Sequence, residues 1–185
     1  MTELMIDIET LSTHSDAAVV SIGYAAFDRT RRVYSNGLFA IRPQDWHGHI
    51  DPQTIKWWMG QSTAAKISTF SGAIDAKVAA LDLRTLIGNE RPTAIWANDP
   101  SFDVVILKNW WRRLLGDAEF PISFRLERSC RTLFDIAKRY GIDYSAAWSA
   151  ADTAHDAMVD ATSQARAVLT IQDELDRLVG YQREG

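Results

Sequence analysis

Two carboxylates interrupt an apolar run at the start of the chain, where the sequence reads MTELMIDIETLS. Residues 4–8 have the apolar character of a buried strand, yet Asp7 and Glu9 fall on alternate positions. Side chains two apart on a strand point to the same face, so these acids lie side by side, where desolvation and like-charge repulsion are unfavourable. Either the acidic face of an edge strand meets water, or a bound divalent cation offsets the clustered charge.

Two later stretches also carry acids at positions where α/β proteins build sites. Asp103 stands in WANDPSFDVVIL, in the first turn of an expected helix that follows a strand. His155 and Asp160 stand in HDAMVD, at the start of the last helix. Sites in such proteins form from the loops and helix starts that follow strands. Taken singly, Asp103 is also explained as an acid that complements the helix dipole, and Asp160 as a surface acid.

The apolar pattern predicts the elements that must position these residues. Strands are expected at residues 4–9, 18–28, 33–41 and 92–98, and a short extended piece leads into a helix within 125–141. Helices are expected at 51–62, 72–88, 99–116 and about 153–178, the second ending at Gly88 and two opened by acid–proline pairs. This order predicts one α/β domain over residues 1–185, with an antiparallel three-strand meander, parallel strands added to it, and helices on the flanks.

Composition narrows the class of protein. The 46% hydrophobic and 24% charged content is ordinary for a soluble globular protein, and no stretch is long and apolar enough to span a membrane. The net charge of −4 argues against a passive binder that coats nucleic-acid backbones, but not against a metal-dependent enzyme. The single cysteine, Cys130, suggests a reducing compartment, so we expect a cytoplasmic protein.

The order and context of the acids resemble the DEDD superfamily of 3′→5′ exonucleases, in the subgroup with a histidine five residues before the last aspartate. The matching positions are Asp7, Glu9, Asp103, His155 and Asp160. The stretches TIKWWMGQS, IWANDPSFD and CRTLFDIA look more narrowly like a compact phage and bacterial branch that includes exoribonucleases. The resemblance covers about residues 5–170 and implies a ribonuclease H-like fold.

This resemblance implies a two-metal site for phosphodiester hydrolysis, with two Mg²⁺ or Mn²⁺ ions bound by carboxylates. Asp7 would bridge both ions, Glu9 and Asp160 would serve the ion on the nucleophile side, and Asp103 the other. His155 would be the general base for the attacking water, because imidazole exchanges protons near neutral pH. Thr10 and Leu11 follow the first motif, where the family contacts the 3′-terminal nucleotide.

Tryptophans provide further candidates for substrate contact. Trp57–Trp58 and Trp110–Trp111 are adjacent pairs, and adjacent residues on a helix do not share a face, so one of each pair is expected to lean away from the core. We expect Trp57, Trp58 and the nearby Gln61 to contact substrate bases, with core packing or a dimer interface as alternatives. For Trp110–Trp111 core packing is favoured. Asn98 either binds substrate or caps the helix that follows.

The expected activity is release of nucleoside 5′-monophosphates from single-stranded 3′ ends, with RNA favoured, DNA as the alternative, and a homodimer expected from the relatives. A nucleic-acid-binding module without catalysis and a paired-carboxylate glycoside hydrolase, which EDTA would not inhibit, are the other candidates. Two positions depart from the family pattern: Asp156 follows His155, and DPS precedes Phe102. His14, His47 and His49 lack the further ligands that a zinc site requires.

Overall fold

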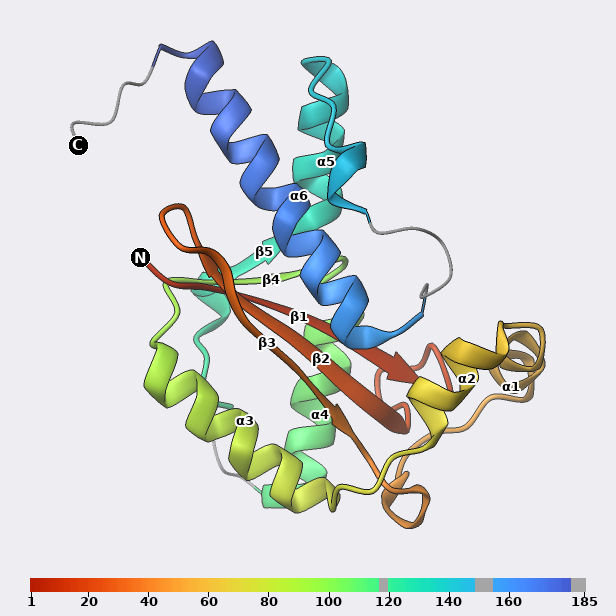
Figure 1. The fold of residues 1–185 in the computed structure, drawn as a ribbon. Coiled ribbons are helices and arrows are strands. Elements are labelled where there is room, and N and C mark those ends of the chain that lie inside the picture. Colours follow the sequence, from red (N-terminus) through yellow and green to blue (C-terminus); the bar gives the residue numbers. More distant parts are fainter. Residues whose placement is uncertain (117–119, 149–154, 181–185) are drawn as a thin grey trace.

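The computed structural model describes residues 1–116, 120–148 and 155–180 of the 185-residue chain. Five strands form one sheet in the order β3-β2-β1-β4-β5 (Figure 1). They are β1 (Glu3–Thr10), β2 (Val19–Asp28), β3 (Arg32–Ala40), β4 (Ala94–Ala97) and β5 (Glu127–Ser129). β1 to β3 form an antiparallel meander, and β4 and β5 extend it in parallel. The predicted mixed sheet is therefore confirmed.

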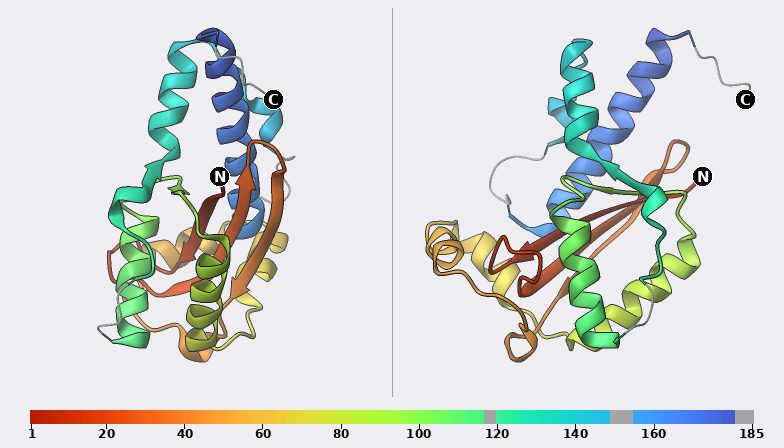
Figure 2. Two further views of the ribbon diagram at one scale, coloured as in Figure 1. Left: turned by 90° about the vertical axis from the view of Figure 1, so that its left-hand side faces the viewer. Right: turned by 180° about the vertical axis from the view of Figure 1, so that it is seen from behind.

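Six α-helices lie among the described residues. They are α1 (Pro52–Met59), α2 (Thr63–Phe70), α3 (Ala76–Glu90), α4 (Asp103–Leu115), α5 (Cys130–Arg139) and α6 (Ala157–Leu178). α3 and α4 cover one face of the sheet, and α5 and α6 cover the other, as the two views of Figure 2 show. α1 and α2 lie past the C-terminal end of β1 (Figure 1). Helices on both faces explain why β2 is apolar along nearly its whole length.

The two faces of β1 belong to different parts of the core. Leu4, Ile6 and Ile8 share one apolar cluster with residues of α3 and α4. Met5 points the other way and shares a cluster with Val168 and other residues of α6. Asp7 and Glu9 continue the side of Met5, because alternate residues of a strand face the same way. The acids therefore lie on the α5–α6 side of the sheet.

Glycine at position 23 sets the distance between α6 and the sheet. Gly23 on β2 pairs with Asp7 on β1. A Cβ atom on Gly23 would lie 2.0 Å from the backbone carbonyl of Ala157, the first residue of α6. Only glycine allows the start of α6 to approach the sheet so closely. The third acidic stretch is thereby brought next to the first.

Two predicted helix boundaries are wrong, and a third falls on residues that the structure does not describe. The helix expected to end at Gly88 continues to Glu90, where Arg91 takes the left-handed conformation at the C-cap, with φ of 45°. The helix expected from residue 99 begins at Asp103, because residues 99–101 form a turn in which the Asp99 carboxylate accepts from the Ser101 N–H and hydroxyl. The last helix begins at Ala157, and the predicted start near residue 153 lies outside the described residues.

α2 is absent from the sequence-based prediction. Its N-cap is Ser62, whose side chain accepts a hydrogen bond from the Ala65 N–H. The eight residues that follow, TAAKISTF, include β-branched and small residues that give a weak helical signal. Contacts with β2 and β3 accompany this helix in the fold. Packing, rather than propensity, therefore explains its position.

The tryptophan pairs differ in their surroundings. Trp57 is 45% exposed and Trp58 is 2% exposed, which confirms that one of the two leans outward. The same prediction is wrong for Trp110 and Trp111, which are 1% and 0% exposed. α4 is covered by the sheet and also by the segment that follows it, where Phe120 packs edge-on against Trp111. Core packing of this second pair, the favoured interpretation, is confirmed.

The described residues include no helix that is both long enough and apolar enough to cross a membrane. Even α6, with 22 residues, carries polar and charged side chains along its length. Cys130 is buried, with its Sγ 3.8 Å from the Met5 Sδ, and burial raises the pKa of its thiol. The thiol therefore acts as an apolar core group.

Candidate active site

The first part of the candidate site is the end of β1. Asp7 is 9% exposed and Glu9 is half-buried, and both side chains lie on the side of the sheet that α6 covers. The pairing of β1 with β2 becomes irregular between Glu9 and Thr10. Such an irregularity re-aims the side chains around it and is common beside functional sites. The edge-strand interpretation of Asp7 and Glu9 is wrong, because β1 is the central strand of the sheet.

The second part is the start of α4, which follows β4. Asp103 is the first residue of this helix and is 4% exposed. Its carboxylate accepts a hydrogen bond from the Asp99 N–H, at 3.1 Å. Asp99 in turn accepts from Ser101 and pairs with Arg131. The DPS turn therefore fixes the orientation of Asp103 even though it lacks a glycine.

The third part is the turn that leads into α6. His155 has φ of 67°, a left-handed conformation that is uncommon outside glycine. Its N–H donates to the Asp160 carboxylate at 3.0 Å. Its ring lies edge-on to Trp57, with ring centroids 4.8 Å apart. The histidine backbone and the last aspartate of the pattern are thus in direct contact.

The carboxylates of the three parts affect one another's ionisation. Burial is the largest cause that raises the pKa of each of the four acids. The pKa of Asp7 is raised further by Asp103, Glu9 and Asp160, and the pKa of Glu9 rises to about 8. The pKa of Asp103 rises to about 6, since its hydrogen bond from Asp99 offsets part of the effect of burial. Four acids from three distant segments therefore converge on one small volume.

A cation fits this set of side chains. Glu9, His155 and Asp160 each offer a ligand atom, and these atoms all lie within 4.8 Å of one another. Asp7 and Asp103 add hard carboxylate oxygens, which Mg²⁺ and Mn²⁺ prefer. Burial and the neighbouring carboxylates raise the pKa values of Asp7 and Glu9, so hydrogen bonds such as that from Gln164 compensate the negative charge only in part. A bound cation would relieve this repulsion.

Gln164 is a site residue that the sequence analysis missed. Its Nε2 donates to the Asp7 Oδ1 at 2.9 Å, and it is buried. The Gln164 Oε1 is buried without a hydrogen-bond partner in the described structure. Gln164 follows Asp160 by four residues on α6, so both lie on the same helix face. That spacing is the signal that would have identified it.

α2 holds the backbone of the histidine turn, and this role was also missed. The Thr69 hydroxyl donates to the His155 carbonyl at 3.2 Å, and the Ser68 hydroxyl donates to the Asp156 carboxylate. Asp156 is also the N-cap of α6, where it accepts from the N–H groups of Met158 and Val159. Its departure from the family pattern therefore has a structural role. α2 gave too weak a helical signal for these contacts to be predicted.

A cavity of about 420 Å³ opens beside Glu9 and continues the site away from the sheet. Thr10, Trp57 and Trp58 line it, together with Ile8 and Phe102. Asp51, Gln53 and Thr54 at the start of α1 provide polar groups in its wall. The Trp58 Nε1 donates to the Thr10 carbonyl at 2.9 Å, which ties α1 to the end of β1. Trp58 is thus both a core residue and a wall of the cavity.

The remaining predicted substrate contacts lie outside the lining of this cavity. Leu11 is buried in a cluster with Trp58, and Gln61 donates through its Nε2 to the Trp57 carbonyl at 3.2 Å. Asn98 is half-buried, and its carbonyl accepts from the Arg131 N–H. The N-cap of α4 is Phe102, so the proposal that Asn98 caps this helix is wrong.

A family model matches the chain from residue 2 to residue 172. It describes the 3′-5′ exoribonuclease Rv2179c-like domain. No curated protein sequence matches the chain. The match includes all five acid and histidine positions of the candidate site.

Solved structures of exonucleases have a similar fold. A structure of E. coli exonuclease I with a 5cy-dT13 oligonucleotide has a TM-score of 0.69 and 17% identity, covering 97% of this chain and 42% of that chain. A product-bound structure of exonuclease I has a TM-score of 0.62 and 17% identity, covering 97% of this chain and 45% of that chain. The nuclease domain of 3′hExo, a DEDDh family member bound to rAMP, has a TM-score of 0.61 and 9% identity, covering 94% of this chain and 92% of that chain. This chain spans less than half of the exonuclease I chains, and the expected ribonuclease H-like fold is confirmed.

Proposed function

The chain belongs to the Rv2179c-like family of 3′-5′ exoribonuclease domains, and we propose that it removes nucleotides from the 3′ ends of single-stranded RNA with divalent cations. The observation that carries this proposal is the convergence of Asp7, Glu9, Asp103 and Asp160 beside His155, at the mouth of a cavity large enough for a nucleotide base. A non-catalytic binding module has no need for four clustered acids that are buried or half-buried and repel one another.

The four acids are the proposed ligands of two cations, Mg²⁺ or Mn²⁺. Such ions, when bound, offset negative charge on the phosphate and on the departing oxygen. Gln164 keeps the Asp7 carboxylate in place through its hydrogen bond. Asp160 orients the turn that carries His155 by accepting its N–H. These two hydrogen bonds orient the Asp7 and Asp160 carboxylates within the candidate site.

His155 is the proposed general base. It would accept a proton from the attacking water at an imidazole nitrogen while the water oxygen forms a bond to phosphorus. The bond from phosphorus to the 3′ oxygen of the preceding nucleotide breaks, and the last nucleotide leaves as its 5′-monophosphate. Trp57, packed edge-on against the imidazole, and Thr69, bonded to the His155 carbonyl, restrict the histidine to one position.

The cavity beside Glu9 is the proposed site of the 3′-terminal nucleotide. Trp57 and Phe102 offer aromatic surfaces for the base, and such stacking contributes about 1–3 kcal/mol per base. Thr10 stays in the proposal as a lining residue. Leu11 and Gln61 would act by supporting Trp58 and Trp57, and Asn98 would reach substrate only beyond this cavity.

The test is release of monophosphate from a 3′-labelled oligonucleotide. We expect cleavage with Mg²⁺ or Mn²⁺ and none with EDTA, with RNA cleaved faster than DNA of the same sequence. Equal or faster cleavage of DNA would favour the deoxyribonuclease alternative, since only contacts to the 2′-hydroxyl distinguish the two substrates. Binding without cleavage under every metal condition would favour the binding module, and EDTA-insensitive hydrolysis of a glycoside would favour the sugar hydrolase.

The setting of this activity is also a proposal. Residues 1–185 would form one exonuclease domain, which is supported by a single sheet whose two faces both carry core clusters. The single, buried Cys130 is consistent with a cytoplasmic location. The homodimer expected from the relatives stays a prediction, which light scattering of the purified chain tests.

A further inference from the structure

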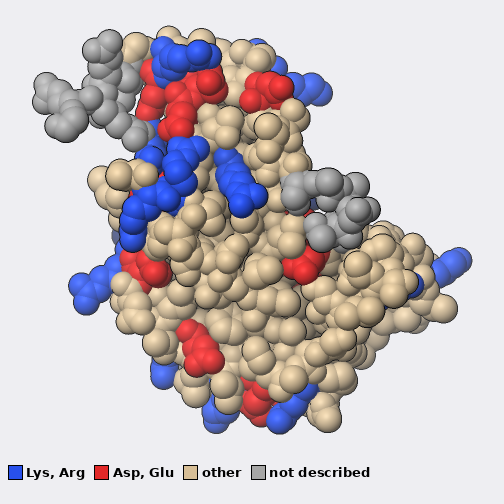
Figure 3. All heavy atoms as spheres, in the orientation of Figure 1, with Lys and Arg blue, Asp and Glu red and all other residues tan. Residues whose placement is uncertain are grey.

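A second cavity, of about 460 Å³, lies between the start of β3, the 3₁₀ helix η3 (Ser145–Ala147) and the middle of α6. Arg32 and Arg166 line it, together with Thr170 and Tyr144, and we name it the arginine cleft. Figure 3 shows Lys and Arg side chains gathered over the β2–β3 turn and the middle of α6, with acids above them over the last turns of α6. Basic side chains therefore gather in one band on this face of a protein of net charge −4.

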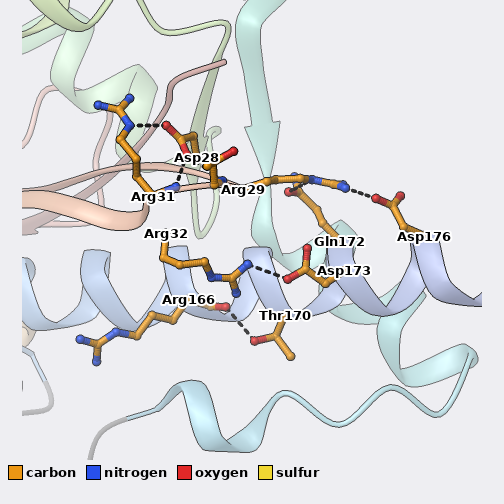
Figure 4. Close-up of polar contacts among 10 residues, drawn as sticks. Asp28, Arg29, Arg31, Arg32, Arg166, Thr170, Gln172, Asp173 and Asp176 are labelled. Atoms are coloured by element: carbon orange, nitrogen blue, oxygen red, sulfur yellow. Dashed lines mark hydrogen bonds and ion pairs between the residues drawn. The ribbon is translucent and has the colours of Figure 1, made fainter. Parts of the chain in front are cut away.

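The charges in this band are not all compensated. Arg32 donates to Asp173 at 2.6 Å, and Arg29 pairs with Asp176, as Figure 4 shows. The acids on the second half of α6 are thus matched by arginines of the β2–β3 turn. Arg166 is exposed and takes part in none of the ion pairs found among residues 1–116, 120–148 and 155–180.

Asp143 is the one acid among the described residues that line the cleft, and it is hydrogen-bonded within its own turn. The Asp143 Oδ1 accepts a hydrogen bond from the Ser145 N–H at 2.8 Å, and this bond lowers the pKa of Asp143. Arg32 uses one nitrogen for Asp173, while a guanidinium has five N–H donors in all. Both arginines of the cleft can therefore donate to an incoming anion.

The arginine cleft is connected to the candidate site by α6. Arg166 follows Asp160 by six residues, which is about 9 Å along a helix axis at 1.5 Å per residue. Figure 4 shows that the Arg166 side chain extends toward the N-terminal end of α6, where the site lies. A stacked strand advances about 3.4 Å per nucleotide, so about three nucleotides span this distance.

We propose that Arg166 and Arg32 bind backbone phosphates of the single-stranded substrate about three nucleotides upstream of the bond that is cleaved. This inference rests on the proposed function. A planar guanidinium binds a phosphate with two parallel hydrogen bonds, and the contact is independent of base sequence. The cleft would hold long substrates by their backbone, whereas dinucleotides would depend on the cavity beside Glu9 alone.

The binding test uses the Arg166→Gln variant and a fluorescently labelled RNA of about ten nucleotides. Affinity is measured by fluorescence anisotropy in EDTA, over about 50–200 mM salt. We expect Arg166→Gln to weaken binding about three- to tenfold and to reduce the slope of log affinity against log salt by about 0.7. Arg166→Lys should restore most of both, because the positive charge is kept.

Arg84→Gln is the matched control. Arg84 is also exposed and outside the ion pairs of the described residues, but it lies on α3, against the opposite face of the sheet. We expect this control to bind RNA like the wild type. Equal losses in both variants, an unchanged salt slope in Arg166→Gln, or no RNA binding by the wild type at about 50 mM salt would each overturn the proposal.

Cleavage separates this inference from the proposed function. With Mg²⁺, Arg166→Gln should raise the KM for the RNA of about ten nucleotides while a dinucleotide keeps its KM and kcat. A parallel loss on the dinucleotide would show that Arg166 acts on the catalytic centre, and would overturn the upstream role. If the wild type binds RNA with the predicted salt dependence but cleaves nothing, the proposed function fails, and only the binding of RNA phosphates by the cleft is retained.

Discussion

β1 and α6 lie against each other along two stretches of opposite chemistry. Toward the start of β1, Met5 shares an apolar cluster with Val168 and Leu169 of α6. Two residues later on the same side of the strand, Asp7 accepts a hydrogen bond from Gln164. The first stretch stabilises the fold by removing apolar surface from water. The second brings like charges together where burial raises their pKa values, which gains nothing for folding and agrees with the proposed function.

Asp7→Asn should show the largest effect on function. Asn has the same size and its oxygen still accepts from Gln164, so the packing is kept while the charge is lost. We expect cleavage to fall about a hundredfold to a thousandfold, as for loss of a central electrostatic group. The melting temperature should stay equal or rise, because a repulsive charge is removed. A clear drop in stability with cleavage retained would contradict the contrast between the two stretches.

Met5→Ala should give the opposite pattern. Met5 is buried, and loss of a buried methionine side chain costs about 2–5 kcal/mol of unfolding free energy. Urea unfolding measures this loss, and cleavage by the folded fraction should change less than about twofold. A variant with normal stability and lost cleavage would show that the apolar stretch also positions the acids.

His155→Ala tests the base separately from the ligands. We expect turnover to fall on the order of a hundredfold, a typical contribution of a general base. Mg²⁺ should still raise the melting temperature of this variant, since the four acids remain. Unchanged turnover would remove His155 as the base, and loss of the Mg²⁺ effect would make it a ligand, which its position near Glu9 and Asp160 allows.

The acidic stretch should make stability depend on pH when metal is removed. The pKa of Glu9 is raised from 4.5 to about 8, so the folded chain keeps a proton that the unfolded chain loses at lower pH. The unfolding free energy of the metal-free protein should therefore fall as pH rises from about 4.5 to about 8. In melting experiments, the difference in melting temperature between Mg²⁺ and EDTA should be larger at about pH 8 than at about pH 4.5. A Glu9→Gln variant should show a flatter pH dependence, and the same flat profile in the wild type would contradict the prediction.

Thr69→Val should have the smallest effect on kcat among the variants of residues in or beside the candidate site. The change keeps the shape of the side chain but removes the hydroxyl that bonds the His155 carbonyl. We expect kcat to fall about fivefold with KM unchanged, the loss of one hydrogen bond, and Thr69→Ser to restore it. A change in KM alone would place Thr69 with substrate binding instead of with the position of His155.

Sequence patterns predicted the strands and helices with a clear apolar periodicity and the positions of the clustered acids. Alternation along β1 placed Asp7 and Glu9 on one face, and the Asp51–Pro52 pair marked the start of α1 correctly. The mixed sheet and its element order followed from the same patterns. The roles of the four acids and His155 stay predictions that the variants above test.

Other features depend on three-dimensional packing that no local pattern encodes. Trp110 and Trp111 are both buried because α4 is covered on two sides. The position of α2, and with it the contact of Thr69 with His155, follows from packing against the sheet. The pairing of Arg29 and Arg32 with acids on α6 joins residues more than 140 positions apart, so only the fold shows that Arg166 is outside the ion pairs of the described residues.

The close approach at Gly23 makes the position of the first turn of α6 depend on the absence of a side chain on β2. A helix of 22 residues is about 33 Å long, and it rests on the sheet at its first residue. Any side chain at position 23 would push the first turn of α6 away from the sheet, and Asp160 would move with it. The other end of the helix would keep its ion pairs with Arg29 and Arg32. A single methyl group on β2, which touches no substrate, would thus be sufficient to pull the third acidic segment out of alignment with the first.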